Sequence, residues 1–336
     1  MLFFKTFRLF LIFILLPGSF CFAFFKKGDA GQEVFSFISS FQSPRNAALE
    51  RSNAALPSSD PGIIFLNPAG FWGNGKNNQV AFHWQTGEFA ENQGALTYAR
   101  SLSRMKFLFS YGWIREGGIE GYDEFGEPTG ETHEPASHLF ATTFSFPLTY
   151  FSFGSTIKFA TDKLSGKAGD QTAMALAFDW GVSYQPATPR FGFALTARDF
   201  GSMIRDYVDD GGEDNYAMGQ TFALSAFFRP AVLPRLTILG ETTFPRYSEP
   251  ALLLGGEYIF GRAFFARVGF TRTWLDLSRD VKELFTSESR PNESNEARFL
   301  SAGLGYEHPL FALDYAFSYL TQGLGMEHRI GLRFGF

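Results

Sequence analysis

The sequence lacks the marks of several protein classes. Cys21 is its only cysteine, so a disulfide scaffold is excluded. Beyond the N-terminal segment no run reaches the length of about 18 apolar residues that a membrane-spanning helix needs, and we do not expect a helical membrane protein. The spread of glycine and proline excludes a coiled coil and a collagen. A net charge of −5 gives no basic footprint, so no nucleic-acid partner is expected.

Motifs for catalysis are missing as well. The five histidines form no His-x-x-x-His pair, and the sequence holds neither a Gly-x-Ser-x-Gly elbow nor a phosphate-binding loop. The acidic run at residues 209–215 is the best candidate for a cation site, yet it lacks the spacing and closing glutamate of an EF-hand. We interpret it as a solvated loop. The sequence therefore predicts no enzyme, no catalytic residue, no metal site and no cofactor.

Phenylalanine, in contrast, is abundant, at 43 of 336 residues. The aromatic residues follow a period of two in segments such as 151–159, 176–184 and 311–319. In the last of these, one face holds Phe311, Leu313, Tyr315, Phe317 and Tyr319, and the other holds Ala312, Asp314, Ala316 and Ser318. An aromatic face opposite a small, polar face is typical of a transmembrane barrel strand, with lipid outside and the lumen inside.

This alternation predicts fourteen strands between residue 79 and the C-terminus. Their expected centres are residues 82, 97, 111, 141, 155, 178, 195, 224, 239, 254, 267, 302, 315 and 331. The even-numbered connections are short, whereas several odd-numbered ones are long and polar, at residues 115–134, 161–170, 201–218 and 274–296. Short turns on one side and long loops on the other are typical of outer-membrane barrels. We therefore predict an all-β protein, in which residues 79–336 form a 14-stranded antiparallel transmembrane β-barrel of the outer membrane.

Both ends of the chain carry predicted export signals. Residues 1–23 are interpreted as a signal peptide, because Lys5 and Arg8 precede a short apolar stretch and cleavage after Ala23 fits a small-x-small site. Lipidation of the cysteine is a weaker alternative, because a large residue precedes it. At the other end, Phe334 and Phe336 close an alternating strand. We interpret them as the signal that the outer-membrane assembly machinery reads.

Residues 24–78 do not show the strand pattern after residue 31, and we predict that they form a plug in the lumen. A short helix is expected at residues 45–51 and a helix start at residues 58–61. The candidate plug residues are Arg45, Asn67, Pro68 and Gly70, the last three in an Asn-Pro-Ala-Gly turn. About 45 residues do not readily fold alone, whereas a polar barrel wall could satisfy their backbone. A periplasmic tail is the alternative.

Inward-facing positions carry charges of both signs. The cations are Lys106, Lys158, Arg198, Arg267 and Arg333, and the anions are Asp179, Glu241, Glu257 and Asp314. Because buried charge needs partners or water, this balance predicts a cross-paired lumen and not an ion-selective ring. A solvated lumen wall is the alternative.

Several stretches resemble a known family. Residues 35–38, 43–49 and 67–70 resemble the N-terminal region of the PorV/PorQ group of outer-membrane proteins, which is similar in fold to the FadL fatty-acid transporter. Residues 95–100 and 120–131 resemble the second strand and first long outside loop of the PorQ members. The chain departs from the group at Glu50-Arg51, where Gly-Gly is usual, and at residues 58–61, where an acidic run is reduced.

The resemblance implies a non-catalytic barrel of the type IX secretion system that tethers the cell-surface attachment complex for exported cargo. The implied partners are the sortase PorU, a PorZ-like surface protein and PorV, in addition to outer-membrane lipid. A FadL-like transporter for hydrophobic small molecules and a PorV-like cargo shuttle stay open as alternatives. Exposed aromatic residues in an acidic rim are typical of interface hot spots, so the predicted partner-binding loop comprises Tyr122, Asp123, Glu124 and Phe125.

Overall fold

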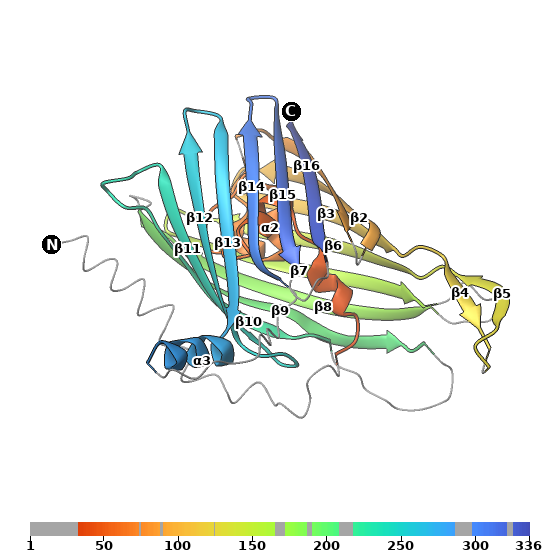
Figure 1. Ribbon diagram of the computed structural model, residues 1–336. Helices are drawn as coiled ribbons and strands as arrows, with labels where there is room; N and C mark the ends of the chain where they lie inside the picture. Colours follow the sequence, from red (N-terminus) through yellow and green to blue (C-terminus); the bar gives the residue numbers. More distant parts are fainter. Residues whose placement is uncertain are drawn as a thin grey trace.

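The computed structural model describes residues 33–73, 75–87, 90–123, 125–164, 172–186, 190–207, 218–285, 298–320 and 325–336. Fourteen antiparallel strands form a closed barrel, and two short strands form a separate hairpin (Figure 1). The predicted signal peptide, residues 1–23, and the first residues of the predicted plug segment lie outside the described residues. Within these ranges no helix is long and apolar enough to cross a membrane.

The barrel strands follow each other around the wall in chain order. They are β1 (Asn78–Gly87), β2 (Ala90–Leu102), β3 (Met105–Arg115), β6 (Ala136–Pro147), β7 (Phe151–Lys163), β8 (Ala173–Tyr184), β9 (Phe191–Arg205), β10 (Thr221–Phe228), β11 (Leu236–Pro245), β12 (Ala251–Phe260), β13 (Phe264–Thr273), β14 (Arg298–Glu307), β15 (Phe311–Leu320) and β16 (Met326–Gly335). The barrel closes where β1 pairs with β16, with Gln79 opposite Gly335 and Thr86 opposite His328. Every predicted strand centre falls in one of these strands, so the predicted fold is confirmed.

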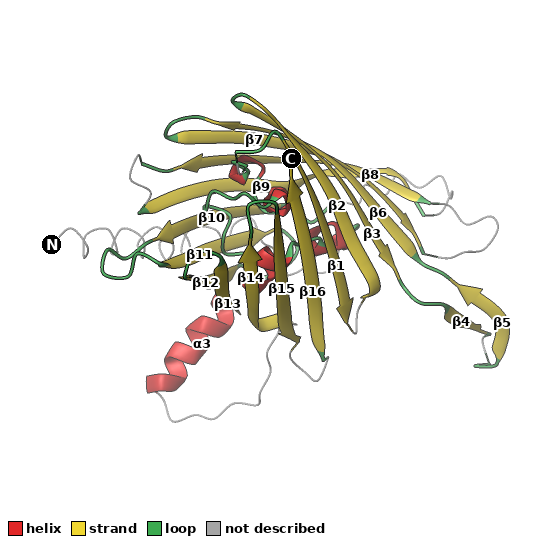
Figure 2. Ribbon diagram, turned by 90° about the horizontal axis from the view of Figure 1, so that it is seen from above, coloured by secondary structure: helices red, strands yellow, loops and turns green. Residues whose placement is uncertain are grey.

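The two ends of the barrel differ, as the sequence predicts. The short-turn end carries the C-terminus and the turns β2–β3, β6–β7, β8–β9, β10–β11, β12–β13 and β14–β15. The long-loop end carries the other connections. At that end the structure corrects two predicted loops: residues 115–134 contain the hairpin β4 (Ile119–Tyr122) and β5 (Pro128–His133), and residues 274–296 begin with helix α3 (Trp274–Phe285). The hairpin and α3 project from opposite sides of this end (Figure 2).

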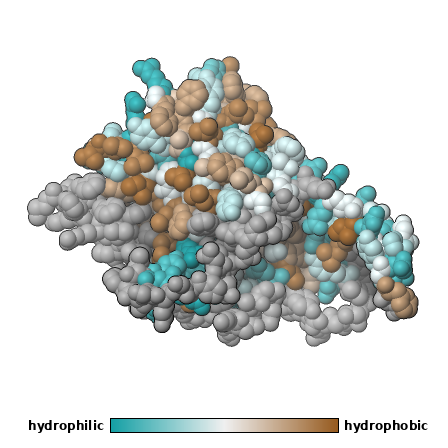
Figure 3. Space-filling model, in the orientation of Figure 1, coloured by the Kyte–Doolittle hydropathy of each residue, from teal (hydrophilic) through white to brown (hydrophobic). Residues whose placement is uncertain are grey.

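The outer face of the barrel is apolar and the inner face is polar. Exposed Phe, Leu, Tyr and Trp side chains lie on the outside of the strands, and Figure 3 shows apolar side chains over the barrel, above the more hydrophilic hairpin. The predicted cross-paired lumen is confirmed for most inward charges, such as Arg198 with Glu241 and Lys158 with Asp179. Lys106 is an exception: it lies beside the β2–β3 turn, where its Nζ donates to Ser103 O at 3.2 Å.

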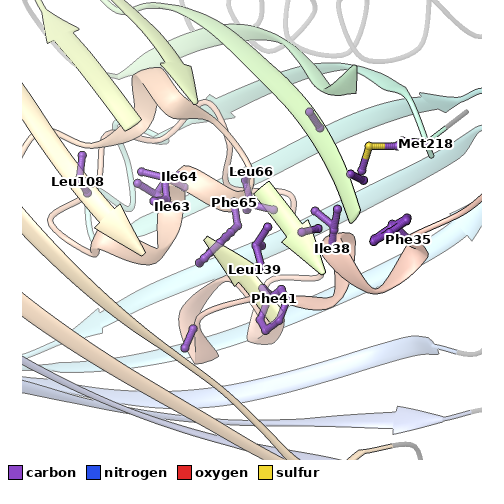
Figure 4. Packing of buried hydrophobic residues seen from close by; sticks show 14 of the residues in the cluster. Phe35, Ile38, Phe41, Ile63, Ile64, Phe65, Leu66, Leu108, Leu139 and Met218 are labelled. Atoms are coloured by element: carbon purple, nitrogen blue, oxygen red, sulfur yellow. The ribbon is translucent and has the colours of Figure 1, made fainter. Parts of the chain in front are cut away.

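The N-terminal segment fills the lumen as four short helical turns: η3 (Ser36–Ser40), α2 (Pro44–Ala48), η4 (Pro61–Phe65) and η5 (Pro68–Gly70). The last three start alike. Ser43, Asp60 and Asn67 each accept a backbone N–H two or three residues later, and a proline follows each of them. This segment packs against the wall through a buried apolar cluster, in which Phe41 and Phe65 of the plug lie beside Leu139 of β6 (Figure 4).

Candidate functional site

Arg45 joins the plug to the barrel wall. Its Nε donates to Glu257 Oε2 at 3.0 Å and its Nη2 to Glu257 Oε1 at 2.9 Å. The third guanidinium nitrogen donates to Ser58 Oγ within the plug at 3.0 Å. A bidentate pair of this kind is strong and geometrically specific. Arg45 therefore fixes α2 against β12.

The Arg45 pair belongs to a longer chain of charges in the short-turn half of the lumen. Glu257 Oε2 also accepts from Arg267 Nε at 2.8 Å. Arg267 Nη1 donates to Asp314 Oδ1 at 2.5 Å, and Arg333 Nη2 to Asp314 Oδ2 at 3.4 Å. We call Arg45, Glu257, Arg267, Asp314 and Arg333 the charge chain. Each charge in it has a partner of opposite sign, which burial requires.

Asp60 extends these contacts inside the plug. Its carboxylate accepts from Ser43 Oγ at 2.5 Å and from the Gly62 backbone N–H at 3.0 Å, and His83 Nε2 lies 3.7 Å away. Burial alone would raise the pKa of Asp60, but Arg333, His83 and the two hydrogen bonds lower it below its ordinary value. A carboxylate held this way is ionised, and it links the start of α2 to the start of η4.

The Asn67-Pro68-Ala69-Gly70 turn fits closely against β7 and β8. Asn67 Nδ2 donates to Ser183 Oγ at 2.8 Å and to Ala54 O at 2.7 Å, while Gly70 O accepts from Ser58 N at 2.9 Å. Two of the wall residues facing this turn are glycines. A Cβ on Gly181 would lie 2.1 Å from Asn67 Oδ1, and one on Gly154 would lie 2.3 Å from the backbone carbon of Pro68. All four candidate plug residues thus lie against other parts of the protein.

A cavity of about 480 Å³ opens in the long-loop half of the lumen. The plug forms one side of it, and β9 to β13 form the other. The apolar lining includes Phe35, Ile38, Met218 and Leu253. The charged lining residues are Glu33, Glu50, Arg51, Arg198, Asp199 and Glu249. Sequence reasoning missed this cavity because its lining comes from distant segments that carry no common motif.

Beside the cavity, the regular backbone pairing of β9 with its neighbouring strands is interrupted. Asp199 has a φ of 60°, and its backbone N–H donates to the side chain of Asp179 at 2.8 Å where a ladder bond would otherwise form. The register between β8 and β9 shifts at this point, and β10 pairs with β9 only as far as Arg198. Lys158 lies 2.7 Å from both aspartates and neutralises part of their charge. The cavity, which Asp199 lines, therefore borders this irregularity in the strand pairing.

The predicted partner-binding loop lies at the tip of the β4–β5 hairpin, which projects to the right of the barrel in Figure 1 and contributes no residue to the cavity lining. Tyr122 is 60% exposed and Phe125 is 81% exposed. Asp123 shapes the turn, because its Oδ1 accepts from the backbone N–H groups of Phe125 and Glu127, each at 2.9 Å. Glu124 lies outside the described residues. The structure thus brings two aromatic side chains to an exposed tip and supplies a reason for the turn between them.

The C-terminal residues seal the barrel at the short-turn end. Phe334 pairs with Val80 of β1 and Phe311 of β15, and it points outward with 47% of its surface exposed. Phe336 exchanges two backbone hydrogen bonds with Asn78, at 2.9 and 3.0 Å. Their role as an assembly signal stays a prediction. Within the described residues, no group of three or more His, Cys, Asp or Glu could hold a metal ion, and residues 209–215 lie outside that part of the chain.

No protein-family model and no curated protein matches the sequence. Among solved structures, the chain is similar to a mutant of the TodX monoaromatic hydrocarbon channel, at 12% identity and a TM-score of 0.61, over 88% of this chain and 99% of that one. It is also similar to the Ralstonia pickettii toluene transporter TbuX, at 12% identity and a TM-score of 0.57, over 88% and 98%. A Pseudomonas aeruginosa FadL homologue matches at 11% identity and a TM-score of 0.55, over 88% and 98%.

At these identities the likeness concerns the fold alone. A plugged barrel of fourteen strands with this arrangement defines the class: the chain has a FadL-like β-barrel fold. Of the three similar structures, TodX is a monoaromatic hydrocarbon channel, TbuX is a toluene transporter, and the third is a FadL homologue. None of the three concerns the PorV/PorQ group, so that resemblance stays a prediction.

Proposed function

We propose that the chain is an outer-membrane barrel that binds a small, mainly apolar molecule at its long-loop end and passes it into or through the wall. The cavity carries this proposal. Its volume of about 480 Å³ lies in the range of small-molecule sites, and apolar side chains from both plug and wall line it. The likeness to TodX, a monoaromatic hydrocarbon channel, and to TbuX, a toluene transporter, supports the same class of ligand.

The orientation follows from the two ends. Long loops of outer-membrane barrels face the outside medium and short turns face the periplasm. The cavity would then open toward the outside, while the charge chain and the η5 turn hold the plug on the periplasmic side. The apolar outer face would contact outer-membrane lipid. A ligand in the cavity would meet the interruption at Asp199 before it meets the tightly packed part of the plug.

Uptake by cells tests this function. Leu253→Trp should fill part of the cavity and lower toluene uptake several-fold, because Leu253 lines it. Leu254→Trp is the matched control, since Leu254 is the neighbouring residue on the outer face and 38% exposed; its uptake should equal that of the native protein. Equal uptake by both variants, or native uptake no greater than that of cells without the protein, would contradict the proposal.

A second candidate function rests on the β4–β5 hairpin. Tyr122 and Phe125 are the exposed aromatic residues of a structured turn that has no packing need for them. Acidic side chains surround them, including Glu120, Asp123 and Glu127. Such a tip fits a protein partner with an apolar pocket and a basic rim. This is the role that the PorV/PorQ resemblance implies, in which the barrel would tether a PorZ-like protein and PorU, together with PorV, in the type IX attachment complex.

Co-purification from outer membranes tests the hairpin. Tyr122→Ala combined with Phe125→Ala should lower affinity for the surface partner about thirtyfold, because loss of one hot-spot anchor already costs about 2 kcal/mol. The control is Val232→Ala with Leu233→Ala, an exposed apolar pair at the short-turn end. Partner recovery, measured by mass spectrometry, should fall only in the first variant. Undiminished recovery there would place the interface elsewhere.

A further inference from the structure

The charged residues around the cavity fall into two groups. Four of them are already engaged, among them Arg51, whose Nη1 donates to Ser39 O at 3.4 Å. Arg198 donates to Glu241 at 3.0 Å, and Asp199 accepts from Lys158 at 2.7 Å. Glu50 accepts from the hydroxyls of Ser301 and Thr271. These contacts lie within the wall, within the plug or between the two, and they leave little capacity for a ligand.

Glu33 and Glu249 form the second group. Neither has an ion pair within the described part of the chain. Glu249 Oε2 is shielded from solvent and has no hydrogen-bond partner. Glu33 comes from the start of the plug and lies over Gly219, where a Cβ would be 3.0 Å from its Oε2. Burial, with the nearby charge of Asp199 as a second cause, raises the pKa of Glu33 above its ordinary value. A buried acceptor without a partner carries a cost that a donor on a ligand would remove.

The remaining lining supplies an apolar surface next to these carboxylates. Phe35 and Ile38 project from the plug, and Met218 and Leu253 project from the wall. Figure 4 shows Phe35, Ile38 and Met218 on the same side of the plug, beyond the packed core of Phe41 and Phe65. A ligand that contacts both parts of the lining needs an apolar body and a polar head.

We propose that the cavity selects amphipathic organic cations, with a protonated amine held by Glu33 and Glu249 and a single-ring or branched apolar body against Phe35, Ile38, Met218 and Leu253. This inference rests on the proposed function, because it names the ligand class of the same cavity. It predicts that neutral hydrocarbons bind in the same cavity but more weakly than ammonium ligands, because they leave the carboxylates unpaired. It also separates the chain from a site for fatty-acid anions.

Two arginines at the cavity would instead favour an anionic ligand. Arg198 Nε is buried and has no hydrogen-bond partner, and Arg51 lines the same cavity. Arg198 is already neutralised by Glu241 at 3.0 Å, whereas Glu249 has no such partner among the residues that the structure describes. The balance of charge at the cavity therefore favours a cation, and an anion of the same shape is the comparison that tests this balance most directly.

Isothermal titration of the full-length mature protein in lipid nanodiscs tests the inference with three probes of similar size: 2-phenylethylammonium, toluene and 3-phenylpropanoate. We expect the ammonium probe to bind more tightly than the other two. Glu33→Gln and Glu249→Gln should each weaken it about tenfold, the usual effect of losing a charge-assisted hydrogen bond, and leave toluene unchanged. Glu120→Gln, on the exposed hairpin, is the control and should change nothing.

The outcomes separate the ligand class from the function. If toluene binds as tightly as the ammonium probe and the glutamine variants have no effect, the cavity is a hydrocarbon site: the proposed function stands and the cation inference fails. If 3-phenylpropanoate binds tightest, the arginines select the ligand and the inference also fails. If no probe binds, while heat-modifiable gel mobility shows a folded barrel, both the inference and the proposed function are overturned.

Discussion

The two halves of the lumen differ in whether their charged side chains have partners of opposite sign. In the short-turn half, the charge chain of Arg45, Glu257, Arg267, Asp314 and Arg333 runs between plug and wall with a partner for every member. In the long-loop half, the carboxylates of Glu33 and Glu249 form no ion pair with any residue in the described part of the chain. The same polar wall thus holds a plug at one end and leaves a site open at the other.

Paired and unpaired buried charges contribute differently to the stability of the protein. A buried pair is expensive to break, because the partner left behind is an uncompensated charge. An unpaired, partly buried carboxylate already carries such a cost in the free protein, and removing it relieves that cost. We infer that the short-turn half is optimised for retention of the plug and the long-loop half for binding.

Removal of the plug should have the largest effect. A barrel of fourteen strands with a polar inner face should fill with water when residues 45–70 are deleted. In planar bilayers we expect no large steady conductance from the intact protein and a steady open pore from the deletion. Heat-modifiable gel mobility of the deletion variant is the control for barrel folding. A large steady pore in the intact protein would show that the segment does not block the lumen.

The contrast between paired and unpaired charge predicts opposite effects on stability. Arg45→Ala leaves Glu257 with only one of its two arginines, and it should lower the unfolding free energy by up to about 3–5 kcal/mol, the usual loss on breaking a buried pair. Glu249→Gln should leave stability unchanged or raise it slightly. Denaturant titration of heat-modifiable mobility measures both. Equal destabilisation by the two variants would remove the distinction between the halves.

The close fit of plug and wall predicts a smaller, steric effect. Gly181→Val would place side-chain atoms where Asn67 Oδ1 lies, since even a Cβ would be 2.1 Å from it. The η5 turn should shift, and brief openings should appear in single-channel records. Gly256→Val is the matched control, because its Cβ would meet only Val268 Cγ1, at 3.6 Å. If neither variant shows channel openings, the turn tolerates displacement without opening the lumen.

Much of the barrel could be predicted from the sequence, because strand alternation is a local signal. The cap-and-proline starts of α2, η4 and η5 are local signals too, and the sequence predicts the one before Pro61. The β4–β5 hairpin was missed, since its strands have no apolar face and depend on hydrogen bonds to Asp123. Helix α3 was missed because it lies in a loop that is polar on average.

The site was less predictable than the fold. The sequence pointed to inward charges of both signs, but it could not pair Arg45 with Glu257, which lies 212 residues away. That pairing exists only once the barrel has closed around the plug. The cavity depends on the same closure, because Glu33 and Glu249 come from opposite sides of it. No spacing in the sequence marks them as neighbours.

The smallest expected effect concerns pH, and it tests whether Glu33 acts in the cavity. Its raised pKa means that Glu33 takes up a proton at a higher pH than an ordinary glutamate does. Since the ammonium probe stays protonated in acid, its binding should be strong while Glu33 is ionised and should weaken as pH falls through that raised pKa. The other ionisable groups facing Glu33 across the cavity are Glu50, Arg51, Arg198, Asp199 and Glu249. The loss should not exceed about tenfold, the contribution of one charge-assisted hydrogen bond.

In Glu33→Gln this step should be absent from the affinity–pH profile, and toluene should give a flat profile in both proteins. A step that survives in Glu33→Gln would assign the titration to another carboxylate of the cavity and leave Glu33 as a structural residue of the plug.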